Sequence, residues 1–264
     1  MENEDITILI QGPLNDTSLS NISEYLKFGN VLISTWMEEE TPLPKLDIPI
    51  GKEKNVKLVS QKLPPKNEWD ARWQGAKQDS TFPWAWQSTM AGLQTIETKY
   101  TIKTRSDEKF VNLQPMIDLH KKTDKLIWGN IWAKIWDKQP HHIGDHIFMD
   151  KTERLLDTYR KIYESIDLNV GAYSAEAVLS ISYMRNLGLN PDSKEDAMSV
   201  YEIMDIDEFD DWVIRHGKFK LTFCKRQHTN LNRNASSYGL PHHHDDCKDT
   251  IEFFRDPNFK LSEG

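Results

Sequence analysis

The stretch Ile6-Thr7-Ile8-Leu9-Ile10 runs directly into Gln11-Gly12-Pro13, so a nearly continuous apolar run ends in a sharp break. Apolar runs of this length are typical of strands that are buried on both faces. The next residues, Asn15-Asp16-Thr17-Ser18, have side chains that cap helices, and apolar residues then recur at helical spacing up to Gly29. This segment therefore predicts a β-strand followed by an α-helix.

The same alternation continues along the first 110 residues. We expect further strands at 31–36 and 56–60, a helix over 84–98, and a strand that begins at Tyr100. Strands that alternate with helices predict a mostly parallel sheet with helices on its faces. The expected fold class is thus α/β, with a Rossmann-like, mostly parallel sheet flanked by helices.

The second half of the chain is expected to add strands at 126–128, 132–136 and 219–223. Helices are expected from about Thr152 and over 174–188, where Ser174 is a candidate N-cap and Gly188 a candidate helix end. Neither a repeat nor a low-complexity linker interrupts the sequence. We therefore expect a single domain over residues 1–264.

Composition narrows the classes of function. The formal net charge of −8 disfavours a nucleic-acid partner, which would normally meet a basic patch. Nine Trp, eight Tyr and ten Phe in a sequence of mean hydropathy −0.65 suit a cleft that binds sugar rings or bases. The acidic start lacks the features of a signal peptide, and we find no apolar run long enough to span a bilayer. These features predict a cytoplasmic protein without a transmembrane segment, for which any membrane contact is peripheral.

The strand that begins at Tyr100 ends in Arg105-Ser106-Asp107-Glu108. Ligands of open α/β sheets lie beyond the carboxyl ends of the strands, where Asp107 is placed to hold a divalent cation together with substrate phosphates. An ordinary acidic turn is the alternative. Arg105 either contacts phosphate or forms a salt bridge with Asp107, because residues two apart share a face of a strand. Glu108 is either a second ligand or solvated, and we favour the solvated position.

In their order, these segments resemble a GT-A-type glycosyltransferase and, more narrowly, the WavE lipopolysaccharide-synthesis family. The resemblance is carried by residues 8–14, 31–36, 87–93, 98–107, 142–148 and 174–176, and so covers most of the chain. Two positions depart from the family pattern. Trp84 and Trp86 stand where a polar pair is usual, and the Asp-x-Asp motif of many GT-A enzymes is reduced to Ser106-Asp107-Glu108.

The resemblance implies transfer of a sugar from a UDP- or GDP-linked donor to a hydroxyl of a glycan or lipopolysaccharide-type acceptor, assisted by Mn²⁺ or Mg²⁺. Residues 6–110 would form the nucleotide-sugar-binding half, 111–228 the acceptor-side half, and 229–264 a polar tail. The donor would contact Gln11, Gly12, Pro13, Gln87, Arg105 and Asp107. The metal would be held by Asp107 and by His244, and the catalytic base would be Glu176 or Asp145.

Each of these assignments has a structural alternative. Gly12-Pro13 also fits a tight strand-to-helix turn. Glu176 is also favoured near a helix N-terminus by the helix dipole. The histidines around His244 also fit an exposed tail. The substitution of Trp84 and Trp86 for polar residues leaves open a non-catalytic carbohydrate- or nucleotide-binding module on the same fold.

Overall fold

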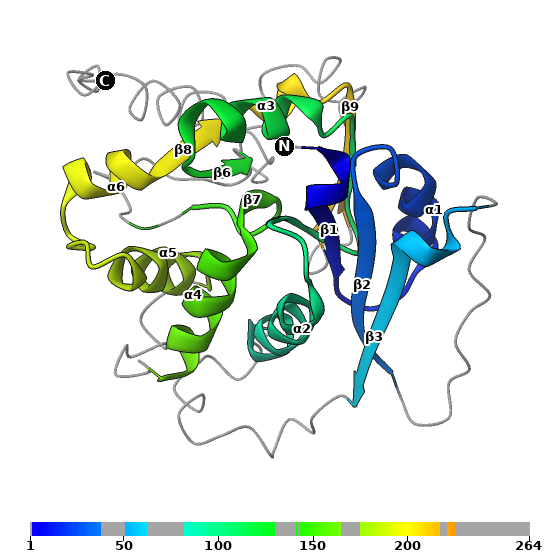
Figure 1. Cartoon of the computed structure of the whole chain (residues 1–264), viewed down its shortest axis with the longest axis horizontal. Helices are drawn as coiled ribbons and strands as arrows, with labels where there is room; N and C mark the ends of the chain where they lie inside the picture. Colours follow the sequence, from blue (N-terminus) through cyan, green and yellow to red (C-terminus); the bar gives the residue numbers. More distant parts are fainter. Residues whose placement is uncertain are drawn as a thin grey trace.

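The computed structural model describes residues 2–37, 51–62, 82–129, 141, 143–164, 175–216 and 221–224. A seven-stranded sheet with the order β3-β2-β1-β4-β7-β6-β8 forms its centre (Figure 1). Its strands are β1 (Ile6–Gln11), β2 (Asn30–Met37), β3 (Val56–Lys62), β4 (Tyr100–Arg105), β6 (Leu126–Gly129), β7 (Phe148–Lys151) and β8 (Tyr201–Met204). Neighbouring strands pair in parallel except at β7, which runs against both β4 and β6. The predicted α/β fold with a mostly parallel sheet is confirmed.

Helices cover both faces of this sheet, and Figure 1 shows α1 and α2 on opposite sides of β1 and β2. The helices are α1 (Asp16–Tyr25), α2 (Phe82–Thr95), α3 (Gln114–Thr123), α4 (Thr152–Glu164), α5 (Ala175–Asn186) and α6 (Lys194–Val200). Leu9 of β1 packs in one core with residues of α2, α4, α5 and α6. Ile8 and Ile10 pack in a second core with residues of α1 and α3. Both faces of β1 are thus buried, which explains its nearly continuous apolar sequence.

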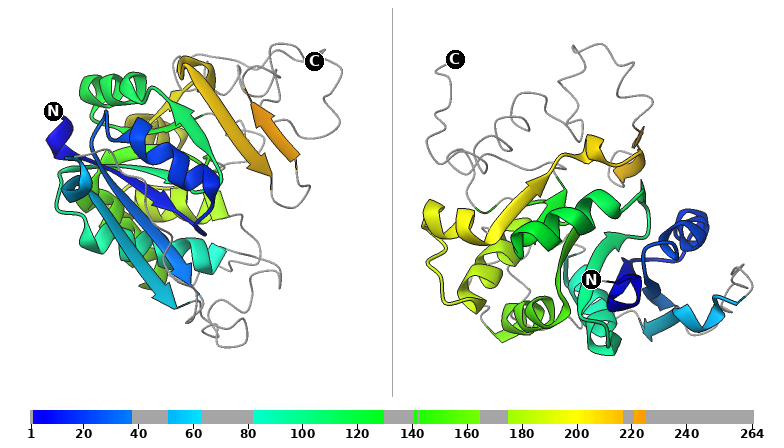
Figure 2. Two further views of the ribbon diagram at one scale, coloured as in Figure 1. Left: turned by 90° about the vertical axis from the view of Figure 1, so that its right-hand side faces the viewer. Right: turned by 45° about the horizontal axis from the view of Figure 1, so that its top comes forward.

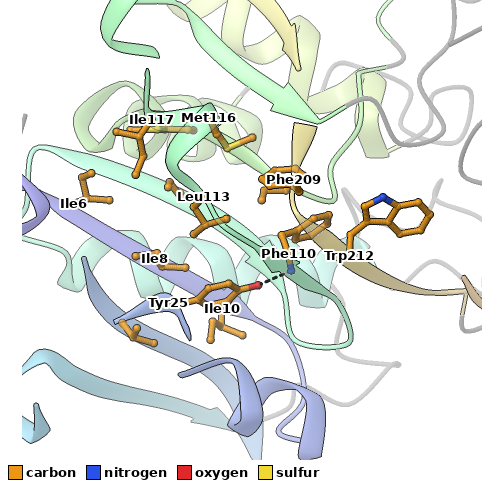
Figure 3. Packing of buried hydrophobic residues seen from close by; sticks show 14 of the residues in the cluster. Ile6, Ile8, Ile10, Tyr25, Phe110, Leu113, Met116, Ile117, Phe209 and Trp212 are labelled. Atoms are coloured by element: carbon orange, nitrogen blue, oxygen red, sulfur yellow. Dashed lines mark hydrogen bonds between the residues drawn. The ribbon is translucent and has the colours of Figure 1, made fainter. Parts of the chain in front are cut away.

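A second sheet of three antiparallel strands, with the order β10-β9-β5, lies beside the main sheet (Figure 2). Its strands are β5 (Lys109–Val111), β9 (Asp211–His216) and β10 (Leu221–Cys224). Phe110 of β5 packs against Phe209 at 5.0 Å between ring centroids, and its N–H donates to the hydroxyl of Tyr25 at 3.2 Å (Figure 3). Since β5 begins directly after Glu108, this packing draws the end of the β4 turn into the core.

Several local predictions can be compared with the structure. Asn15 caps α1 through a hydrogen bond from the Ser18 N–H at 3.0 Å. Gly188 ends α5 with a φ of 75°, as expected. The predicted helix over 84–98 instead spans Phe82–Thr95. The elements β5, α3, β7, α6, β8 and β9 were not predicted from the sequence, and the strand expected at 132–136 lies outside the described residues.

Among the helices that the structure describes, none is long and apolar enough to cross a membrane.

Candidate functional site

The order of the strands reverses direction at β1. The connection through α1 leads from β1 to β2 on one side, whereas the chain later returns through α2 to β4 on the other side. At such a switch point the two connections leave the sheet in opposite directions, and a crevice opens beyond the carboxyl ends of the strands. The fold itself therefore indicates a ligand site beyond the ends of β1 and β4.

Gln11 and Arg105 lie opposite each other at this point. They are partners in the parallel pairing of β1 with β4, and Gln11 is also the partner of Ser34 on β2. Partners in register share a face of the sheet, and the Ser34 hydroxyl, which donates to the Ser88 carbonyl of α2 at 2.6 Å, identifies that face. The side chains of Gln11 and Arg105 therefore stand next to each other on the α2 face.

Arg105 and Asp107 form a bidentate ion pair. The Nε and Nη2 atoms of Arg105 each lie 3.1 Å from one carboxylate oxygen of Asp107. About 31% of the Arg105 side chain and 28% of the Asp107 side chain remain exposed, so both groups can reach a ligand. The salt bridge between Arg105 and Asp107, which was the alternative to a phosphate contact, is thus present in the structure. It does not exclude a ligand role, because both partners are at the surface.

The expectation that Glu108 is solvated is wrong. Its side chain is fully buried, and one of its oxygens, Oε1, contacts both Nδ1 of His146 and, at 3.3 Å, Nε of Arg105. The side chain of Asn21 donates to the Glu108 carbonyl at 2.7 Å. The chain turns inward here because the next residues form β5, which is anchored by Phe110. Glu108 is consequently an internal partner of Arg105 and not an exposed ligand.

Asp145 and His146 reach the same edge from the loop before β7. His146 Nε2 lies 3.8 Å from Asp145 Oδ1, while Nδ1 of the same ring faces Glu108. The ammonium group of Lys103 donates to the Asp145 carbonyl and is almost completely buried. Burial lowers the pKa of Lys103, although the nearby Asp145 carboxylate opposes that shift. Because β7 is reversed, its beginning, and not its end, lies at the candidate site.

More carboxylates than basic groups surround Arg105. Burial alone would lower the pKa of Arg105, but the carboxylates of Glu108, Asp107 and Asp145 raise it above the ordinary value for an arginine. Lys103 is a second basic side chain on the same strand, and burial lowers its pKa. Arg105 is thus permanently charged and has two donor N–H groups directed at a partly exposed carboxylate.

Gly12 is required by the packing of the two strand ends. A Cβ atom at this position would lie 2.4 Å from the Ser106 hydroxyl oxygen, and the φ of Gly12 is 131°. The Ser106 N–H donates to the Gln11 carbonyl at 2.8 Å, and the Gly12 N–H donates to the Ser34 carbonyl at 3.1 Å. This geometry favours the tight-turn explanation for Gly12, while Pro13 is exposed next to it.

Gln87 lies at the same edge as the strand ends. It is half-buried and precedes Ser88, whose carbonyl accepts the hydrogen bond from Ser34 near the end of β2. The structure therefore places Gln87 near the candidate site, on the helix that covers β1 and β2.

Glu176 is on another part of the fold, in the first turn of α5. Asn186, at the end of α5, donates to the carbonyl of Arg154 in the first turn of α4 at 3.4 Å. That turn follows β7, whose Lys151 pairs with Tyr100 at the start of β4. The last turn of α5 is thus at the amino edge, and one turn after Glu176 the Ser180 hydroxyl contacts Tyr201, at the start of β8, at that edge as well. Its helix packs against α4 and α6, whereas α2 covers β1 and β2.

The residues of this site suit a divalent cation in only one way, in which substrate phosphates supply part of the coordination. In the part of the chain that the structure describes, no three His, Cys, Asp or Glu side chains converge to form a metal-binding group. Mg²⁺-type ions, however, are often held by one or two carboxylates together with substrate phosphates. Asp107 suits that mode because it is partly exposed, whereas Glu108 is buried and engaged. His244 lies outside the described residues.

A separate cavity of about 220 Å³ lies at the opposite edge of the sheet. It is lined by Thr7, Asn30, Lys57 and Thr98, among others, near the starts of β1 and β2. Ligands of parallel sheets bind beyond the carboxyl ends of the strands. We therefore place the candidate site at the β1–β4 switch point and not in this cavity.

Two features of the site were not predicted from the sequence. No role was predicted for Lys103, although its place two residues before Arg105, on the same face of the strand, was a visible signal. His146 was considered only as part of a histidine cluster. Its contact with Glu108 joins residues 38 positions apart, and no local pattern predicts it.

Searches with protein-family models and among curated proteins found no match for this chain. The functional argument therefore depends on the geometry described above.

Proposed function

We propose that the protein is a GT-A-type glycosyltransferase related to the WavE lipopolysaccharide-synthesis family. It moves a sugar from a nucleotide-diphosphate donor, UDP- or GDP-linked, to a hydroxyl of a glycan or lipopolysaccharide-type acceptor. The observation that carries the proposal is the register match between Gln11 and Arg105 at the switch point, with Asp107 paired to Arg105. An amide, a guanidinium and a carboxylate thus meet where α/β sheets bind nucleotides.

Arg105 is the proposed phosphate ligand. Its planar group already makes two parallel contacts to a carboxylate, and a phosphate presents a similar pair of oxygens. When the diphosphate replaces Asp107 as the partner of Arg105, the Asp107 carboxylate becomes available to a cation. Asp107 would hold Mn²⁺ or Mg²⁺ together with the donor phosphates. Such an ion neutralises charge on the leaving diphosphate.

The proposed base for an inverting reaction is Asp145, with Glu176 as the rival. A base must reach the acceptor hydroxyl as its oxygen attacks the sugar. Asp145 is close enough to interact with the charge of Arg105, and Lys103 fixes its backbone. Glu176 lies in the first turn of α5. If the reaction retains configuration, neither residue has this role.

The proposed setting is the cytoplasm, with peripheral contact to a membrane where the acceptor is lipid-linked. No nucleic-acid partner is proposed, given the net charge of −8.

The test is a panel of UDP- and GDP-sugars, assayed for hydrolysis and for transfer to glycan acceptors with and without Mn²⁺. We expect Mn²⁺-dependent release of UDP or GDP by the wild type and its loss in Arg105→Gln. A matched control is Lys99→Gln, which changes an exposed cation outside the site. The proposal is wrong if no donor is bound or consumed, or if Arg105→Gln retains wild-type rates.

The second candidate is a non-catalytic carbohydrate- or nucleotide-binding module. It is favoured by the engagement of both Asp107 oxygens by Arg105. Donor binding without hydrolysis or transfer, over the same panel, would favour this module over the enzyme.

A further inference from the structure

Two tryptophans from different elements meet at the carboxyl edge of β2. Trp36 is the seventh residue of β2, and Trp84 lies in the first turn of α2. Their ring centroids are 6.4 Å apart with an angle of 49° between the planes, and both side chains are half-buried. The rings therefore form an angled pair that keeps part of its surface accessible.

The packing of α2 against the sheet holds this pair in place. The Ser34 hydroxyl donates to the Ser88 carbonyl, and the Ser88 hydroxyl donates to the Trp84 carbonyl at 2.9 Å. Gly92 permits the close approach, because a Cβ atom there would lie 2.5 Å from a methyl group of Leu9. The first turn of α2 is thus fixed against the end of β2.

The tryptophan pair lies in line with the residues of the candidate site. Trp36 is two residues beyond Ser34, the partner of Gln11, so its side chain is on the same face and beyond the end of β1. Gln11 is in turn the partner of Arg105. From β2 to β4 the distance is two strand spacings, or about 10 Å. An aromatic pair, an amide and a guanidinium thus follow one another along one edge.

We propose that Trp36 and Trp84 bind the nucleobase of the donor, an inference that rests on the proposed function. In an extended nucleoside diphosphate a ribose separates the base from the phosphates, which matches the order along this edge. Base stacking on aromatic rings is favourable for any base, because every base has a π-face. Gln11 lies between the tryptophan pair and Arg105 in this order; its side chain is almost completely buried, and its amide has a donor and an acceptor that suit a ribose hydroxyl.

Binding measurements with matched probes test this subsite. Affinities for UDP, GDP, inorganic pyrophosphate and a methyl glycoside are measured by calorimetry, with quenching of tryptophan fluorescence as a second readout. Trp36→Leu and Trp84→Leu remove the rings, and Trp36→Phe keeps an aromatic face. Trp86→Phe is the control on the same helix, because the Trp86 indole N–H donates to the Tyr159 carbonyl of α4 at 2.8 Å. Circular dichroism checks the fold of each variant.

We expect each leucine variant to bind UDP or GDP about ten-fold more weakly, with pyrophosphate affinity unchanged. Trp36→Phe retains nucleotide binding and loses part of the quenching, and Trp86→Phe behaves as the wild type. If one leucine variant does not fold, the other leucine variant gives the same readout.

Three results would overturn the inference while the proposed function stands. These are unchanged nucleotide affinity in the leucine variants, equal weakening of nucleotide and pyrophosphate, and ring-dependent binding of the methyl glycoside alone with nucleotide affinity unaffected. Failure of the wild type to bind any nucleotide or pyrophosphate would instead reject the proposed function, and the inference with it.

Discussion

Arg105 and Asp107 are joined by two contacts of 3.1 Å, one from Nε and one from Nη2 of the guanidinium. Glu108, the next residue, approaches the same guanidinium from the interior at 3.3 Å. Arg105 thus has one partner at the surface and one in the core. In the proposed function a ligand replaces the surface partner, whereas the buried partner keeps the guanidinium in position.

Asp107→Ala separates a functional role from a structural one. We expect donor turnover to fall by about 100-fold or more, because loss of the cation would remove several kcal/mol of charge stabilisation. The free energy of unfolding should change by less than about 1 kcal/mol, since the ion pair is partly exposed. Donor hydrolysis and urea denaturation give the two values. Wild-type turnover in a folded variant would reject the metal role.

Glu108→Ala should instead have a large effect on the free energy of unfolding. Its removal leaves His146 without its buried partner, and we expect the free energy of unfolding to fall by about 3 kcal/mol. Glu108→Gln keeps the shape and removes the charge, and is the matched control. Urea denaturation beside Asp107→Ala measures the contrast. Equal losses for the two neighbouring residues would contradict the burial of Glu108.

Gly12→Ala tests the contact between the two strand ends. We expect a loss of about 2 kcal/mol, because the new Cβ meets the Ser106 hydroxyl and the positive φ is strained. The double variant Gly12→Ala/Ser106→Gly should recover part of that loss, with Ser106→Gly as the reference. The four free energies of unfolding form a double-mutant cycle. Strict additivity would show that Ser106 is not the obstacle.

Lys103→Met tests the buried ammonium group through its pH dependence. Burial lowers the pKa of Lys103 in the folded protein, so between that pKa and the ordinary lysine value the unfolded chain binds more protons. The wild type should therefore gain stability relative to Lys103→Met as the pH rises from neutral toward about 10. Denaturation at several pH values measures the difference in the free energy of unfolding between the wild type and Lys103→Met, with the permanently charged Lys103→Arg as control. A difference in the free energy of unfolding, wild type minus Lys103→Met, that stays constant or falls over this range would contradict the shift.

Asp145→Asn and Glu176→Gln distinguish the two candidate bases. We expect the residue that acts as base to lower kcat by about 100-fold or more without changing donor affinity. The position of Asp145 beside Lys103 favours it for this role. Single-turnover transfer and calorimetry with the donor separate the two effects. Full activity in both variants would exclude an inverting mechanism through either residue.

The sequence was sufficient for the half of the fold where local pattern and tertiary burial agree. β1 to β4, α1 and α2 were anticipated because apolar runs and helix caps mark them directly. β5 has only three residues, and pairing with β9, about a hundred positions later, stabilises it. No local signal specifies a strand of this kind.

The candidate site could likewise be predicted only where a local pattern marks it. The end of β4 could be recognised because a carboxylate follows a buried strand. The burial of Glu108 could not, because it depends on His146 and on the inward turn into β5. Burial of a carboxylate is favourable only with a partner, and that partner comes from a distant loop.

The pairing of β1 with β4 also affects how the protein folds. Thr7 and Thr98, whose hydroxyls lie 2.7 Å apart, are separated by 91 positions in the sequence. Contacts over such separations close large loops and form slowly. Gln11 and Arg105 become neighbours only when this pairing is complete. In the proposed function, the rate at which nucleotide binding recovers during refolding would therefore report the rate at which β1 pairs with β4.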